Sequence, residues 1–224
     1  MNGPGIGFRK HGDEPRTAVE AGGGPLRPAS VADPLFERVR RSAIARFSAA
    51  PFHKVGMRAI ARDAGAGMAT LYEVAGGKDA LLQACLAPDF EARLARVAAA
   101  SRREVSCRSR LRACIAELIA FELDRPEFAR IIRLNTPAQL MRDADADGGL
   151  ERVFIEILRR GVREGALRTD IPADALACMV QALTDGALAR WAAEAGEADR
   201  FIAEVVQART DRLFSLLWPA ICAG

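Results

Sequence analysis

The chain has 224 residues, 50% of them hydrophobic and 27% charged, a balance that excludes an intrinsically disordered or fibrous protein. Its net charge is only +3, and arginine outnumbers lysine so strongly that base composition of the genome explains the arginine count better than function does. No apolar run reaches the roughly 18 residues that span a bilayer, and no secretory signal is visible at the N-terminus. We therefore expect a cytoplasmic globular protein.

Residues 1–33 are rich in glycine and proline and lack apolar periodicity, which predicts a disordered N-terminal tail. The pattern then becomes helical, because Asp33 is a good N-cap and Pro34 suits the first position of a helix over 34–49. Breaks at Pro51, at 64–67 and at 76–77 predict two more short helices, over 57–64 and 68–75.

The rest of the chain also shows only helical periodicity. A longer helix is expected to begin near Lys78 and to kink or break at Pro88, and Ser106 can cap the next one. Further helices are predicted from Pro126, over 150–164 with Gly165 as its stop, and over about 172–194 and 199–217. The core face of the helix over 172–194 is Leu176, Val180, Leu183, Ala187 and Trp191. The predicted fold is all-α, with a three-helix domain over 34–80 and a larger helical domain over 81–224.

The charge is unevenly distributed along the chain. Residues 35–85 hold eight basic and four acidic side chains, a net charge of +4, and two of the three lysines, Lys54 and Lys78. A small basic helical module beside a neutral helical body is typical of nucleic-acid binding, although a solvated helix face explains the charge equally well.

The spacing of the short helices favours nucleic-acid binding. The segments 57–64 and 68–75 are joined by Gly65-Ala66-Gly67, which is the layout of a helix-turn-helix whose second helix enters the major groove. Gly65 suits the positive φ required after a helix end, and Ile60 and Ala64 can contact Leu71 across the turn.

This stretch resembles the N-terminal region of the tetracycline-repressor-like (TetR) transcriptional regulators. The residues that carry the resemblance are Ile60-Ala61, Ala64-Gly65, Thr70-Leu71-Tyr72 and Lys78, within about 45 similar residues. The resemblance implies that Thr70 and Tyr72 contact DNA and that Lys78 contacts a backbone phosphate at the start of the following helix. Lys54 and Arg58 are further phosphate candidates. A half-buried core position is the alternative for Tyr72.

The sequence departs from the family pattern at three places. Gly67 and Met68 stand where a polar residue usually opens the recognition helix, Glu73 follows Tyr72, and Val55-Gly56 replaces the usual cap of the first motif helix. Glu73 would repel phosphate unless it faces a cytosine amino group or Arg62. We therefore expect weaker or more shape-dependent operator binding, with Met68 or Ala69 contacting a thymine methyl group.

The resemblance also implies that the C-terminal domain binds a small ligand and forms a homodimer. Small residues on the last two helices, about 172–194 and 199–217, would allow the close packing of a four-helix interface, although they could serve the monomer core alone. The composition suggests an apolar ligand, and the pocket candidates are Cys114, Phe121, Phe128, Gln139, Met179 and Trp191.

Other chemistries find little support. Asp143, Asp145 and Asp147 begin an EF-hand-like pattern, but Phe154 occupies the position of its bidentate glutamate. With two histidines and no C-x-x-C pair, we expect no metal site, no cofactor and no catalytic constellation. The leading hypothesis is a ligand-responsive repressor that binds a pseudo-palindromic operator. The alternative is a small-molecule-binding protein that keeps the fold but has weak or lost operator recognition.

Overall fold

The computed structural model of the chain describes residues 34–135, 149–194 and 202–223. Within these ranges it contains nine α-helices, one short 3-10 helix and no strand, so the all-α prediction is confirmed. The predicted N-terminal tail, Gln139 and the aspartates at 143, 145 and 147 lie outside the described residues. No helix in the described part is long and apolar enough to cross a membrane.

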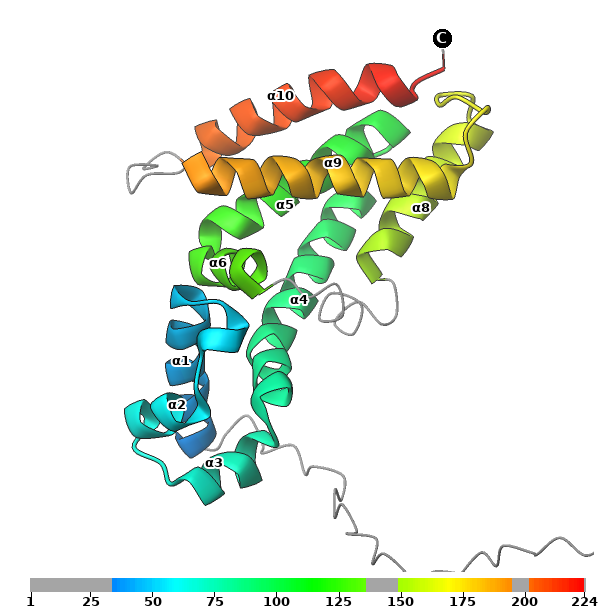
Figure 1. Cartoon of the computed structure of the whole chain (residues 1–224). Helices are drawn as coiled ribbons and strands as arrows, with labels where there is room; N and C mark the ends of the chain where they lie inside the picture. Colours follow the sequence, from blue (N-terminus) through cyan, green and yellow to red (C-terminus); the bar gives the residue numbers. More distant parts are fainter. Residues whose placement is uncertain (1–33, 136–148, 195–201, 224) are drawn as a thin grey trace, which may run out of the picture.

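The first helices form one end of the molecule (Figure 1). They are α1 (Pro34–Ala49), the 3-10 helix (Phe52–Lys54), α2 (Met57–Ala64) and α3 (Met68–Ala75). The bounds of the three α-helices agree with the predicted ranges, whereas the 3-10 helix was not predicted. Buried side chains of α1, α2 and α3, among them Val39, Phe47, Ile60 and Leu71, form an N-terminal core.

The body follows, with α9 and α10 at the opposite end from α3 (Figure 1). Its core is built largely from α5, α8, α9 and α10. The body helices are α4 (Lys78–Arg103), α5 (Cys107–Asp124), α6 (Pro126–Asn135), α8 (Gly149–Arg163), α9 (Ala173–Glu194) and α10 (Ile202–Ile221). Two predicted boundaries are confirmed, since Ser106 accepts a hydrogen bond from the Ser109 backbone N–H at 3.1 Å and Gly165, with φ +71°, follows α8.

The helix α4 connects the two cores. It passes through Pro88 without ending, so the expected break is wrong. Pro88 is exposed, whereas Leu86 is buried in the N-terminal core and Phe90 packs against it, which holds the helix together on either side of the missing N–H. Further along α4, Val97 belongs to the core of the body.

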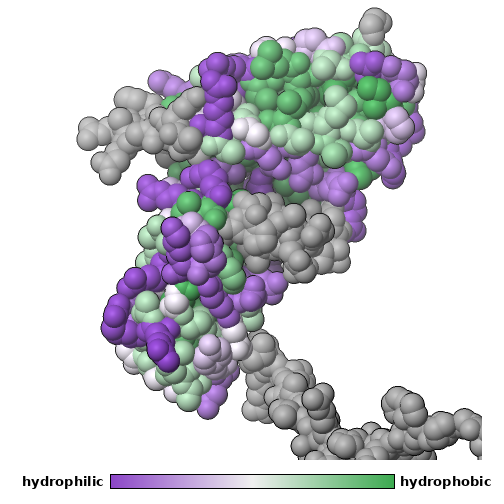
Figure 2. All heavy atoms as spheres, in the orientation of Figure 1, coloured by the Kyte–Doolittle hydropathy of each residue, from purple (hydrophilic) through white to green (hydrophobic). Residues whose placement is uncertain are grey.

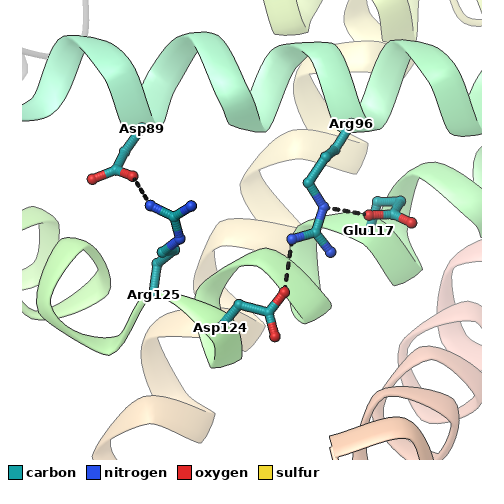
Figure 3. A network of polar contacts seen from close by, with 5 residues as sticks. All are labelled: Asp89, Arg96, Glu117, Asp124 and Arg125. Atoms are coloured by element: carbon teal, nitrogen blue, oxygen red, sulfur yellow. Dashed lines mark hydrogen bonds and ion pairs between the residues drawn. The ribbon is translucent and has the colours of Figure 1, made fainter.

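Polar contacts fix α4 against α5 (Figure 3). Arg96 of α4 donates from Nε to Glu117 at 2.8 Å and from Nη1 to Asp124 at 2.7 Å, and both acceptors lie on α5. Arg125, which follows α5, donates back to Asp89 of α4 at 2.7 Å. These contacts therefore fix the position of α5 along α4.

The core face of α9 differs from the prediction at Leu183. Its side chain is 49% exposed, whereas Thr184 is fully buried. The Thr184 hydroxyl donates to the Val180 carbonyl of its own helix at 2.7 Å, so a polar side chain can lie in the core without an unpaired donor. Leu176, Val180 and Trp191 are buried as expected.

Candidate nucleic-acid interface

The turn between α2 and α3 is set by Gly65. This residue has φ +64° and ψ +36°, the left-handed conformation that glycine adopts without steric cost. The Ala66 N–H then donates to the Ala61 carbonyl at 2.9 Å and the Gly65 N–H to the Arg62 carbonyl at 3.2 Å. These bonds satisfy the last carbonyls of α2 and turn the chain toward α3.

The crossing of α2 and α3 is held by buried apolar contacts and by α1. Ile60 and Leu71 are fully buried and Ala64 is nearly so, all in the N-terminal core. From α1, Arg38 donates to the Ala64 carbonyl at 3.3 Å and Ser42 to the Ile60 carbonyl at 3.2 Å. The outer face of α3 therefore has a fixed orientation relative to the rest of the domain.

Most of the predicted DNA-contacting residues lie at the surface of this unit. Tyr72 is 48% exposed, so it is not a core aromatic, and Ala69 and Gly67 are exposed beside it. Thr70 is half-buried, and Met68 packs in part against the N-terminal core. Lys54, in the 3-10 helix, and Arg58, in the first turn of α2, are both exposed.

Lys78 occupies the first position of α4. Its Nζ lies 4.2 Å from the centroid of the Phe52 ring, and that ring stacks on Phe47 at 5.9 Å. A cation–π contact of this kind holds a lysine ammonium in place without neutralising its charge. The ammonium therefore remains available to a phosphate beside the N-terminus of α4.

The N-termini of α2, α3 and α4 share a feature that the sequence reasoning identified only for α2. Each has glycine as N-cap, at Gly56, Gly67 and Gly77, and none of these caps supplies a side-chain hydrogen bond. Backbone N–H groups of the first helical turn have no partner within the helix, and phosphate oxygens satisfy such groups well. The signal was present in the sequence as glycine at the position before each helix.

Two acidic residues of the helix-turn-helix, Asp63 and Glu73, have different surroundings. Asp63 accepts from Arg46 Nε at 2.7 Å and lies 3.5 Å from Arg62 Nε. The Arg46 hydrogen bond lowers the pKa of Asp63 below its ordinary value, so this carboxylate stays ionised and paired. Arg62 is thus directed to Asp63, and Glu73 is exposed on α3.

The pocket candidates are spread over the body. Cys114 and Trp191 are buried in its core, whereas Phe121 and Phe128 are buried in the N-terminal core. Met179 is 42% exposed on α9. The cavity described below is lined by none of these five residues.

Comparison with known sequences gives one family match, and it covers the N-terminal helices. Residues 40–85 match the sequence profile described as bacterial regulatory proteins, tetR family. A search of curated proteins finds no match.

Solved transcription regulators share the fold of this chain. A tetR family transcription regulator from Shewanella sp. PV-4 superposes with a TM-score of 0.69 at 18% identity, covering 86% of this chain and 100% of that one. FadR from Bacillus subtilis, in complex with stearoyl-CoA, gives 0.66 at 14% identity over 80% and 98%. The ketosteroid regulator KstR2 of Mycobacterium tuberculosis gives 0.65 at 16% identity over 88% and 100%. Residues 40–85 therefore resemble the tetR family of bacterial regulatory proteins, and the chain has the fold seen in solved TetR-family transcriptional regulators.

Proposed function

We propose that this protein is a transcriptional repressor that acts in the bacterial cytoplasm, binds a pseudo-palindromic operator as a homodimer and is released by a small molecule. Residues 34–80 would read the DNA, and residues 81–224 would bind the effector and the second subunit. The observation that carries the proposal is the exposed outer face of α3, held by Gly65 and the N-terminal core next to Lys78.

The chemistry of that face suits a DNA backbone. The Tyr72 and Thr70 hydroxyls can donate to phosphate oxygens, while Lys54, Arg58 and Lys78 supply positive charge around them. Base contacts are fewer, because Ala69 and Glu73 occupy the exposed positions where a hydrogen-bond donor would read a purine. Recognition would then depend on DNA shape and on apolar contact with thymine methyl groups.

The exposed face of α9 supports the homodimer. Large apolar side chains, Met179 and Leu183, are 42% and 49% exposed there, and Leu216 on α10 is 72% exposed. The helix α9 also exposes small side chains, which allow close helix packing, at Ala175, Cys178, Ala182, Gly186 and Ala189. Apolar residues gather on the side of α9 and α10 that faces the viewer in Figure 2. A two-fold pairing through this face would present two recognition helices to one operator.

The structural neighbours support a ligand-responsive body, since one was solved with stearoyl-CoA and another is a ketosteroid regulator. In this chain both α4 and α5 contribute side chains to the body core and to the N-terminal core. A ligand that favours one arrangement of the body would therefore change the spacing of the recognition helices and lower operator affinity by linkage.

DNA binding is tested by fluorescence anisotropy with the DNA upstream of the protein's own gene, over a range of salt concentrations. Lys78→Gln should weaken binding and reduce the slope of log K against log salt by about 1, because one phosphate contact is lost. Arg130→Gln, which changes an exposed residue of α6, is the matched control. Binding without sequence preference at any salt concentration would refute the repressor.

The homodimer is tested separately by sedimentation at micromolar concentration. Leu183→Glu should yield a monomer, because it places a charge in the apolar interface. Leu134→Glu on α6, where the native side chain is 42% exposed, should leave the dimer intact.

A second candidate follows from the exposed Ala69 and Glu73 on α3: a small-molecule-binding protein with the same fold and little operator recognition. In that case the dimer and ligand binding would persist while Tyr72→Phe and Lys78→Gln leave reporter expression unchanged.

A further inference from the structure

A cavity of about 560 Å³ lies between α4, α5 and α8. Its apolar part is formed by Ala98 of α4 and by Val153 and Ile157 of α8. Arginines from all three helices surround this part, namely Arg102 from α4, Arg110 from α5, and Arg160 and Arg163 from α8. Four arginines from three separate helices thus line one cavity.

The carboxylates of the cavity do not neutralise these arginines. Glu164 is paired with Arg160, with Arg160 Nε 2.5 Å from Glu164 Oε1. Glu156 is the other acidic residue of the lining. Among the described residues no ion pair is found for Arg102, Arg110 or Arg163. Two positive charges therefore remain in excess.

Arg110 is the most informative of the four. Its Nε atom is buried and has no hydrogen-bond partner. A buried donor without a partner is uncommon in native proteins, because the lost hydration is not replaced. A ligand in the cavity would satisfy it once the Arg110 side chain turns toward the ligand, because a guanidinium binds the oxygens of a phosphate through two parallel hydrogen bonds.

The cavity does not belong to the DNA-binding surface. It is lined by α8 and by the C-terminal half of α4, whereas α3 lies at the other end of the molecule (Figure 1). An operator held by α3 would not reach these arginines. Their partner is therefore a separate anion, and a cavity of this volume is of the size that holds a small molecule.

We propose that this cavity binds a small organic phosphate, with the phosphate on Arg102, Arg110 and Arg163. The carboxylate of Glu156 would accept a hydrogen bond from a hydroxyl group elsewhere on the same ligand. This site is independent of the operator and of the homodimer proposed above, because its lining includes no residue of α3, α9 or α10.

The test is calorimetric titration of the full-length protein with glycerol phosphate, and with inorganic phosphate in parallel, at low ionic strength. We expect saturable binding of both, with glycerol phosphate binding more tightly. The double variant Arg102→Gln/Arg163→Gln should weaken binding about tenfold or more, because two charge-assisted contacts are lost. Arg103→Gln is the matched control, since Arg103 is the exposed neighbour of Arg102 and is absent from the lining.

Two further variants test the individual roles. Arg110→Met removes the unpaired Nε and leaves no polar group, so it should abolish binding while the unligated protein unfolds at the same or a higher temperature. Glu156→Gln should tighten inorganic phosphate, because it removes a repulsive charge, and should reduce the preference for glycerol phosphate. The proposal is overturned if neither phosphate saturates at millimolar concentration. It is equally overturned if Arg103→Gln weakens binding as much as the double variant.

Discussion

Phe128 offers a quantitative test of how the body is joined to the N-terminal core. It lies on α6, is 4% exposed, and packs edge to face against Phe90 at 5.2 Å and Phe121 at 5.5 Å between ring centroids. Phe128→Ala removes this buried ring and both aromatic contacts. Truncations of this kind cost about 3–5 kcal/mol, which is a large part of the roughly 5–15 kcal/mol that stabilises a native protein.

The measurement is urea unfolding followed by far-ultraviolet circular dichroism, with the midpoint and slope compared among variants. Phe128→Leu keeps most of the volume but not the aromatic contacts and should cost about 1–2 kcal/mol. Leu134→Ala on the same helix changes a side chain that is already 42% exposed, and should cost under about 1 kcal/mol. If Phe128→Ala destabilises the protein no more than Leu134→Ala does, α6 does not contribute to the N-terminal core as described.

Further outcomes are expected from the turn, the thiols and the α4–α5 contacts. Gly65→Ala should lower the free energy of unfolding by about 1–2 kcal/mol because of the positive φ, and Gly65→Asn by less, as thermal denaturation would show. Burial raises the pKa of Cys85 and Cys114 to about 12, so native-state alkylation at pH 8, read by mass spectrometry, should modify the partly exposed Cys222 before either of them. Because these two pKa values are raised on folding, their contribution to stability is complete below about pH 9 and is lost as the pH rises toward 12, measurable by urea titration at each pH. Arg96→Met should destabilise the protein, because Glu117 and Asp124 lose a shared partner, and the Asp124→Asn variant should recover part of the loss in a double-mutant cycle.

The sequence predicted several helix ends well, because a helix end depends on a few neighbouring residues. Gly65, Ser106 and Gly165 act through their own φ angle or a nearby N–H, and the structure confirms each of them. The location of the predicted DNA contacts follows from the same short helices. Their role in binding DNA remains a prediction.

Features that depend on tertiary packing were harder to predict from the sequence. Helical periodicity placed Leu183 in the core, but it does not distinguish a face buried in the subunit from one left exposed on α9. Pro88 looked like a break, because its effect depends on how Leu86 and Phe90 pack on either side. The arginine cavity joins positions from 102 to 163, so no local pattern could indicate it.

Because α4 contributes to both cores, it limits where this chain can be joined to a relative in a hybrid protein. A hybrid joined at residue 80 would take α1, α2 and α3 from this chain but would lose Leu81, Leu82 and Cys85 of α4, and Phe128 of α6, which complete the N-terminal core. The transferred segment would then have to match whatever side chains the recipient body presents. Exchange of the N-terminal unit between relatives should therefore succeed when the crossover lies after Phe90 and the α6 face of this chain is carried over as well.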